Sequence, residues 1–175
     1  MNCSNTTLVL GGARSGKSAF AERLVADAAG TRLYLATAIV GDDEMRERIA
    51  HHRARRSDGW RTIEEPLALV ETLSREGRAS NAIMVDCLTL WLSNLMHSGK
   101  DVDGESRRLS AYLRETRAKK IVLVSNEVGL GLVPDTPLGR AFRDAQGRLN
   151  QAVAAAVNNV VFIAAGLPIW LKQQS

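Results

Sequence analysis

The sequence predicts an α/β fold in which a mostly parallel sheet lies between two layers of helices. Two observations lead to this prediction: short apolar runs recur along the chain, and segments with helical spacing separate them. Apolar runs without polar alternation are typical of parallel strands that helices cover on both faces. Strands that alternate with helices form such a three-layer sandwich. No Pro/Ser-rich linker or internal repeat divides the chain, so residues 1–175 are expected to form a single domain.

The strands are expected where an apolar run is too short for a helix and ends at polar or glycine residues. They cover residues 7–10, 33–36, 83–88, 121–125 and 160–165. The helices are expected where apolar residues recur at three- and four-residue steps. They cover residues 17–29, 43–56, 66–76, 89–96, 106–117 and 139–158, the last with Phe142, Ala145, Leu149, Ala152 and Ala156 in step. Residues 98–105 are polar and contain glycine, which indicates a surface loop.

Composition narrows the class of protein. Apolar residues make up 45% and charged residues 24% of the chain, which is the balance of an ordinary globular protein. The net charge of +4 and the pI near 9.4 suit a polyanionic substrate, but this excess is too small to indicate nucleic acid. Cys3 and Cys87 form no disulfide or metal-ligand pattern, and Cys87 is expected to be a small buried hydrophobic residue.

No targeting segment is apparent. The N-terminus lacks the basic segment and following apolar stretch of a signal peptide. No apolar run approaches the roughly 20 residues that span a bilayer. With no disulfide pattern either, the sequence predicts a cytoplasmic protein without a membrane span.

The most informative motif follows the first expected strand. Gly11-Gly12-Ala13-Arg14-Ser15-Gly16-Lys17-Ser18 matches the phosphate-binding pattern G-x-x-x-x-G-K-S/T, and a helix is expected to start at Lys17. Glycines let successive backbone N–H groups turn toward phosphate oxygens, and the helix N-terminus adds a positive dipole. Lys17 is expected to reach the outer phosphates, and the Ser18 hydroxyl to ligate Mg²⁺. A nucleoside triphosphate such as GTP or ATP is the expected ligand.

Asp86 stands near the end of the third expected strand. A carboxylate at the carboxyl end of a parallel strand faces the same sheet edge as the phosphate loop. Asp86 is therefore expected to be a second Mg²⁺ ligand, and the alternative is an N-cap for the following helix.

The expected helix over residues 43–56 begins with acidic residues and then becomes strongly basic, with Arg46, Arg48, Arg53, Arg55 and Arg56. His52 lies on the apolar stripe of this helix with Met45 and Ile49, whereas His51 is rotated about 100° from it. A neutral imidazole is a nucleophile toward phosphorus, and guanidinium groups stabilise the charge on a phosphate under attack. These residues alone leave nucleophilic and structural roles for His52 equally open.

Further distinctive segments extend almost to the end of the chain. They are Ala36-Thr37-Ala38; Trp60-Arg61-Thr62 with Glu64; Asp86-Cys87-Leu88-Thr89; Ser125-Asn126-Glu127-Val128-Gly129-Leu130-Gly131-Leu132-Val133-Pro134; Phe142-Arg143-Asp144; and Gly147-Arg148-Leu149-Asn150-Gln151. Together with the phosphate loop and the His-Arg helix, they resemble the bifunctional adenosylcobinamide kinase/adenosylcobinamide-phosphate guanylyltransferase family of cobalamin biosynthesis. The combination is more specific than the phosphate loop, which many families share.

The resemblance implies two reactions, a RecA-like P-loop NTPase sheet and a homotrimer. A nucleoside triphosphate would phosphorylate adenosylcobinamide, and a guanylylated histidine would then transfer GMP from GTP to adenosylcobinamide-phosphate. The family's I-x-x-H-R motif places that histidine at His52, with His51 as the alternative. The implied GTP contacts, besides the phosphate loop, are Ala36, Thr37, Ala38, Arg53, Ala54, Arg55, Arg56, Glu64 and Asp86. Glu127 has either a role near substrate or metal, or a role in positioning its own turn.

Two other functions compete with this interpretation. One is a monofunctional P-loop kinase of a small metabolite, in which His52 is structural. The other is a nucleotide-dependent DNA-binding module. The sequence argues against DNA, because aromatic residues make up only 5% of the chain and the basic cluster is confined to one helix.

Overall fold

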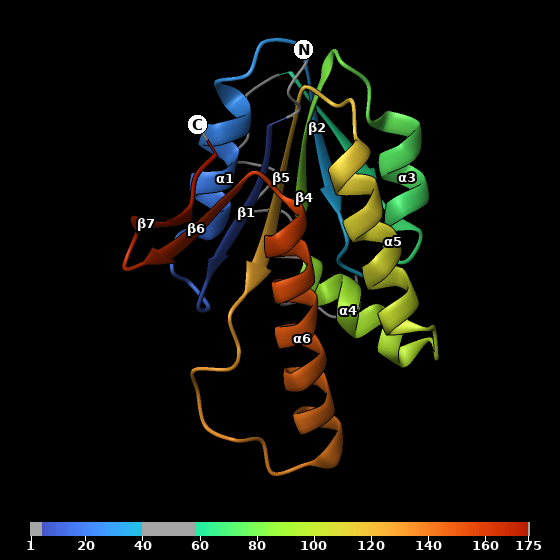
Figure 1. Ribbon diagram of the computed structural model, residues 1–175, viewed down its shortest axis with the longest axis vertical. Helices are drawn as coiled ribbons and strands as arrows, with labels where there is room; N and C mark the ends of the chain where they lie inside the picture. Colours follow the sequence, from blue (N-terminus) through green and yellow to red (C-terminus); the bar gives the residue numbers. More distant parts are fainter. Residues whose placement is uncertain (1–4, 40–58, 175) are drawn as a thin grey trace.

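The computed structural model describes residues 5–39 and 59–174 (Figure 1). In chain order the elements are β1 (Asn5–Gly11), α1 (Lys17–Ala26), β2 (Thr31–Ala36), β3 (Trp60–Glu64), α3 (Leu69–Glu76), β4 (Asn81–Asp86), α4 (Leu88–His97), α5 (Val102–Glu115), β5 (Lys120–Asn126), α6 (Pro137–Ala156), β6 (Asn159–Ala164) and β7 (Leu167–Lys172). The expected helix over residues 43–56 lies outside the described residues, as does Cys3.

The strands form one seven-stranded sheet in the order β3-β2-β4-β5-β1-β6-β7. Every neighbouring pair is parallel except β6 and β7, which are antiparallel. Strand β1 lies between β5 and β6, so the segment that follows β1 leaves the sheet near its middle. The predicted α/β class with a mostly parallel sheet is confirmed.

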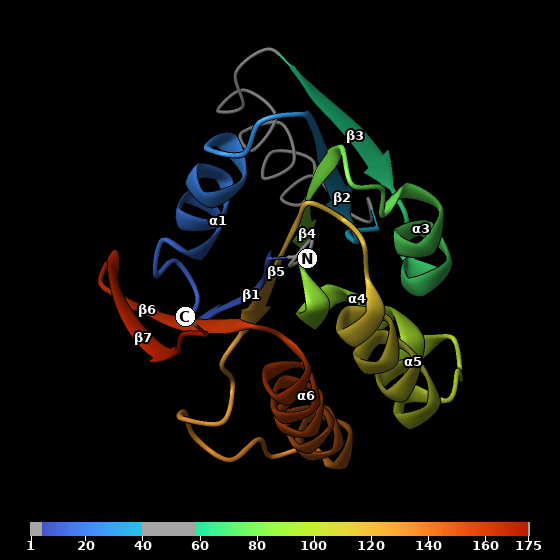
Figure 2. The same cartoon turned by 45° about the horizontal axis from the view of Figure 1, so that its top comes forward.

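Helices cover both faces of this sheet (Figure 2). On one face, α3, α4, α5 and α6 pack against a core that includes Leu33, Ile83 and Leu123. On the other face, α1 packs through Ala21 and Val25 on a second core cluster. Since successive side chains of a strand point to opposite faces, each buried strand supplies both clusters, which explains the continuous apolar runs. The described helices include none that is long and apolar enough to cross a membrane.

Two strands were not expected from the sequence. Strand β3 is an edge strand whose side chains are mostly exposed, so it lacks the continuous apolar run used to find strands. Strand β7 is the other edge and contains Pro168, which an edge strand tolerates because it lacks a backbone N–H for the ladder. It also reverses direction after β6 through a tight turn at Ala165 and Gly166, both with positive φ.

Several predicted boundaries were wrong. Residues 98–105 are not all loop, because α5 starts at Val102, where Asp101 accepts a hydrogen bond from the Gly104 N–H at 2.9 Å. Similarly, α6 starts at Pro137 with Thr136 as its N-cap. The third expected strand overran by two residues, since β4 ends at Asp86 and Leu88 already begins α4.

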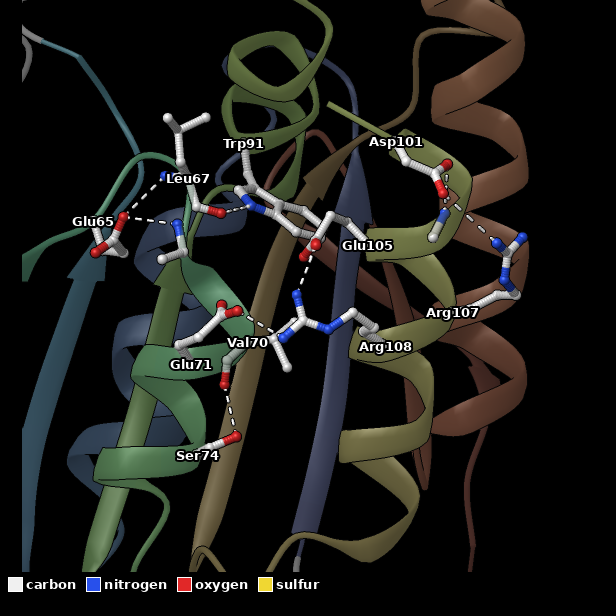
Figure 3. A network of polar contacts seen from close by, with 12 residues as sticks. Glu65, Leu67, Val70, Glu71, Ser74, Trp91, Asp101, Glu105, Arg107 and Arg108 are labelled. Atoms are coloured by element: carbon white, nitrogen blue, oxygen red, sulfur yellow. Dashed lines mark hydrogen bonds and ion pairs between the residues drawn. The ribbon is translucent and has the colours of Figure 1, made fainter. Parts of the chain in front are cut away.

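Helices α3, α4 and α5 are joined by the polar contacts in Figure 3. Glu65 accepts hydrogen bonds from the Leu67 and Ala68 N–H groups at 3.0 and 2.8 Å, which satisfies backbone donors at the start of α3. The buried Trp91 of α4 donates its indole N–H to the Leu67 carbonyl oxygen at 2.9 Å. These contacts hold the chain after β3 against the core.

Replacing Trp91 by phenylalanine is expected to lower the free energy of unfolding by about 1–3 kcal/mol, because the change leaves the Leu67 carbonyl oxygen without its donor and leaves a small cavity. Urea denaturation followed by far-UV circular dichroism measures the change. The matched control is Trp170→Phe on edge strand β7, where the side chain is 39% exposed, with an expected loss below about 0.5 kcal/mol. Equal losses of unfolding free energy in the two variants would contradict a stabilising role for the buried Trp91 and its hydrogen bond to Leu67.

Candidate nucleotide-binding site

The phosphate-loop motif lies between β1 and α1, as the sequence predicted. Gly16 is the N-cap of α1, and Lys17 is the first residue of that helix. The Phe20 N–H donates to the Gly16 carbonyl oxygen at 3.0 Å, which closes the first helical turn. Ala13 and Arg14 are exposed on the loop, and Ser18 is half-buried in the first turn of α1. The arrangement strand, glycine loop and helix N-terminus suits a bound phosphate.

Two glycines of the loop are required by their surroundings. A Cβ at Gly11 would lie 2.4 Å from the Ile163 carbonyl oxygen, so strand β6 leaves no room for a side chain there. Gly16 has a φ of 99°, a left-handed conformation that glycine adopts without strain. Any side chain at either position would shift the loop.

Neighbouring strands support the loop through its backbone. The Gly166 N–H, in the turn between β6 and β7, donates to the Ser15 carbonyl oxygen at 2.9 Å. On the other side, the Glu127 N–H donates to the Gly11 carbonyl oxygen at 3.0 Å. The support from Gly166 was not predicted, although the Ala165-Gly166 pair between two apolar runs is a signal for a tight turn at this point.

Lys17 is buried at the foot of the loop, with 7% of its surface exposed. Its Nζ donates to the Gly12 carbonyl oxygen at 2.5 Å. Burial lowers the pKa of Lys17, while the negative charge of the Asp86 carboxylate acts in the opposite direction. Lys17 follows the loop at the carboxyl end of β1, so it lies along the same edge of the parallel sheet as the end of β4.

Asp86 ends β4 at the same carboxyl edge. Its Oδ2 accepts a hydrogen bond from the Tyr34 hydroxyl at 3.1 Å, which orients the carboxylate. The N-cap of α4 is Cys87, and no side chain caps that helix, so the capping alternative for Asp86 is wrong. Ala36 of β2 is in register with Asp86 on one side and Glu64 on the other. Three predicted site residues thus end adjacent strands at one level.

Thr37 is fully buried just beyond β2. Its hydroxyl donates to the Cys87 carbonyl oxygen at 2.7 Å and accepts from the Cys87 N–H at 2.8 Å. Asn94 donates its side-chain N–H to the Thr37 carbonyl oxygen at 2.8 Å. The Thr37 side chain therefore joins the ends of β2 and β4, and the half-buried Ala38 follows it at the edge.

Glu127 follows β5 and positions its own turn. One of its carboxylate oxygens accepts a hydrogen bond from the Gly129 N–H at 2.5 Å. Arg143 of α6 donates to the Gly129 carbonyl oxygen at 3.2 Å. These contacts agree with the second of the two roles expected for Glu127.

The predicted nucleophile and the basic residues around it, His51, His52, Arg53, Ala54, Arg55 and Arg56, lie outside the described residues. Their roles stay predictions.

The two predicted Mg²⁺ ligands supply oxygen atoms. Ser18 offers a hydroxyl group and Asp86 a carboxylate, the hard donors that Mg²⁺ prefers. Within residues 5–39 and 59–174, no three His, Cys, Asp or Glu side chains gather as a protein-only metal site. The residues present therefore fit a Mg²⁺ ion that shares its coordination with nucleotide phosphate oxygens and water.

Cys87 is buried beside this edge, as predicted, and its burial raises the pKa of the thiol to about 12. Because the thiolate is the reactive form, native Cys87 is expected to resist a disulfide reagent at pH 8 and to react fully after denaturation. A Cys3→Ser variant removes the signal of the other cysteine. Rapid reaction of the folded variant would contradict this burial.

Comparisons with known proteins agree with this geometry. The family model described as "Cobinamide kinase / cobinamide phosphate guanyltransferase" matches residues 7–171. The bifunctional adenosylcobalamin biosynthesis protein CobP of Pseudomonas aeruginosa is 52% identical over 94% of this chain and 96% of its own length. The bifunctional adenosylcobalamin biosynthesis protein CobU of Escherichia coli is 39% identical, over 94% of this chain and 98% of its own length.

A solved structure supports the fold alone. An ATPase from the type III secretion system of pathogenic bacteria aligns with a TM-score of 0.56 at 12% identity, over 95% of this chain. The chain spans only 56% of the length of that ATPase. The P-loop NTPase fold that the sequence predicted is therefore confirmed.

Proposed function

This chain belongs to the cobinamide kinase/cobinamide phosphate guanyltransferase family, and from that premise we propose that it catalyses both reactions of its family. It phosphorylates the hydroxyl group of the aminopropanol arm of adenosylcobinamide and then joins GMP to the new phosphate, giving adenosylcobinamide-GDP. The observation that carries the proposal is the phosphate loop, which places the buried Lys17 along the same carboxyl edge of the parallel sheet as Asp86.

In the kinase reaction, the loop N–H groups and Lys17 bind the phosphates of ATP or GTP. The substrate hydroxyl oxygen bonds to the γ-phosphorus, the bond to the bridging oxygen breaks, and the nucleoside diphosphate leaves with the electron pair. Positive charge around the phosphoryl group stabilises its oxygens in the transition state. Ser18 and Asp86 would hold Mg²⁺, which neutralises phosphate charge when bound.

In the second reaction, His52 is the nucleophile. Its imidazole nitrogen bonds to the α-phosphorus of GTP, and pyrophosphate leaves with the electron pair. The phosphate of adenosylcobinamide-phosphate then attacks the same phosphorus and displaces the histidine. Arg53, Arg55 and Arg56 contribute charge that favours both attacks. Ala36, Thr37, Ala38, Ala54 and Glu64 complete the GTP contacts.

We further propose a cytoplasmic homotrimer that takes no nucleic acid as substrate. The edge strand β7 supports an interface between copies, because Leu167, Ile169 and Leu171 are 69%, 53% and 62% exposed. Exposed apolar side chains on an edge strand favour association. Light scattering is expected to give the mass of a trimer, and a monomer at all concentrations would contradict it.

The function is tested with two labels. With adenosylcobinamide and Mg²⁺, label in the γ-phosphate of ATP or GTP is expected to move to the corrinoid, and label in the α-phosphate of GTP is expected to appear first on the protein and then on the product. Transfer of the γ-label without any α-label on protein or product would favour the monofunctional kinase. Transfer of neither label would reject the proposal.

A further inference from the structure

Asn126 ends β5 beside the phosphate loop. Its Cα is in register with that of Gly11, the first residue of the loop. The residue after it, Glu127, donates its N–H to the Gly11 carbonyl oxygen. Asn126 is therefore the neighbour of the loop on the β5 side of the sheet.

The alternation of side chains along β5 assigns the Asn126 side chain to the sheet face that α1 covers. Val124 belongs to the core cluster on that face. Ser125 points to the opposite face, where its hydroxyl donates to Asn150 of α6 at 2.7 Å. Since successive side chains of a strand point to opposite faces, Asn126 shares the face of Val124.

Asp86 lies on this face as well. Its hydrogen-bond partner Tyr34 belongs to the core cluster under α1. Its strand β4 is the neighbour of β5 on the side away from the loop. The Asn126 amide and the Asp86 carboxylate thus lie on one face of the sheet, at the carboxyl edge where the loop and Lys17 are proposed to bind phosphate.

The backbone of Asn126 is held on both sides. Its N–H donates to the Thr89 hydroxyl at 2.8 Å, and its carbonyl oxygen accepts from the Asn150 side-chain N–H at 3.1 Å. Asn150 in turn accepts from Gln146 at 3.0 Å, and Gln146 also donates to Ser125 at 3.0 Å. Ser125 and Gln146 are fully buried, and Asn150 is 6% exposed.

The stability of the fold does not by itself explain why this network of polar side chains is buried. Buried hydrogen bonds add only modest net stability, because desolvation offsets most of their energy, and well-packed apolar residues could fill the same space at similar stability. A network of buried hydrogen bonds does, however, hold a segment in one geometry. The side-chain amide of the segment's central residue, Asn126, makes no hydrogen bond of its own in the part of the chain that the structure describes.

We propose that Asn126 is a catalytic residue of phosphoryl transfer, whose side-chain N–H donates to the terminal phosphate of the bound nucleotide. This inference rests on the proposed kinase activity. As the hydroxyl oxygen bonds to the terminal phosphorus and the bond to the bridging oxygen breaks, the hydroxyl proton passes to solvent and the diphosphate keeps the electron pair. The amide stabilises the negative charge on the equatorial oxygens of the transferred group.

Asn126→Ala is expected to lower kcat of the kinase reaction about 100-fold, with KM for the nucleotide within about threefold of wild type. In Asn126→Asp the new side chain has the shape of asparagine, but it places a carboxylate where a hydrogen-bond donor is needed. The kcat of this variant is therefore expected to fall at least as far. The isosteric Asp variant also keeps the test decisive if the Ala variant folds poorly. Guanylyl transfer to pre-phosphorylated substrate is expected to fall much less.

The matched control is Asn159→Ala, at the opposite end of the sheet, where the side chain bonds Asn5 at 3.2 Å. It is expected to keep wild-type kcat. Folded Asn126 variants with kcat within about threefold of wild type would overturn the inference. Equal loss of kinase and guanylyl transfer would overturn it too, since it would indicate a general structural role. Absence of kinase activity in the wild-type protein would instead reject the proposed function.

Discussion

His52→Ala is expected to abolish guanylyl transfer, by at least about 10⁴-fold in kcat, while phosphoryl transfer to adenosylcobinamide stays within about tenfold of wild type. The reason is that, in the proposed mechanism, the imidazole forms the bond to the α-phosphorus in one reaction and takes no part in the bonds of the other. Incubation with α-labelled GTP and Mg²⁺ measures the covalent intermediate directly. Its phosphorus–nitrogen bond is expected to break in acid and to survive in base.

His51→Ala is the matched control for this prediction. It removes the neighbouring imidazole, which the helical spacing places about 100° from the apolar stripe, and is expected to keep the covalent label. A His52→Ala protein that still carries the label would reject His52 as the nucleophile. If His51→Ala loses the label instead, the nucleophile is His51.

Lys17→Ala is expected to have the second large effect, lowering kcat/KM of both reactions by about 10²–10³-fold. In the proposed mechanism both reactions hold the triphosphate in the same loop, where the buried Lys17 binds the phosphates. Because burial lowers the pKa of Lys17, its charged form is partly disfavoured in the folded protein. Removing it is therefore expected to leave the free energy of unfolding within about 1 kcal/mol of wild type. Steady-state assays and urea denaturation measure the two quantities.

The matched control is Lys119→Ala, since Lys119 is exposed at the opposite end of the sheet, before β5. It is expected to change neither reaction. Loss of only one reaction in Lys17→Ala would contradict a shared loop and indicate a second nucleotide site.

The sequence predicts this fold well where packing depends on local pattern. Strands β1, β2, β4, β5 and β6 were expected, because a strand covered on both faces must be apolar at every position. The edge strands β3 and β7 were missed for the converse reason. Their pairing depends on a neighbouring strand that is distant in sequence or reached by a tight turn, and little apolar pattern is required.

The residues of the candidate site also fall into two groups: those that a local sequence pattern predicts and those whose roles depend on tertiary contacts. The phosphate loop could be predicted because its function requires particular residues at consecutive positions, and its context of strand and helix was confirmed. Thr37 was expected to contact GTP, yet its hydroxyl forms hydrogen bonds with the backbone of Cys87. Asn126 was noted only as part of a distinctive segment and attracted no role of its own, since the residue type does not show where its side chain lies. Its network depends on Asn150 of α6, which lies 24 residues further along the chain.

By itself, the sequence determined the class of the fold, the phosphate loop and the family resemblance, because each depends on residue types at fixed spacing. Only the tertiary structure decided which side chains meet at the carboxyl edge. It placed Asp86 and Lys17 along one edge of the sheet, used Thr37 to join two strands, and set Asn126 in register with Gly11. The physical reason is that parallel strands bring together residues far apart in the chain, and the hydrogen bonds that fix their side chains form only after the sheet is assembled.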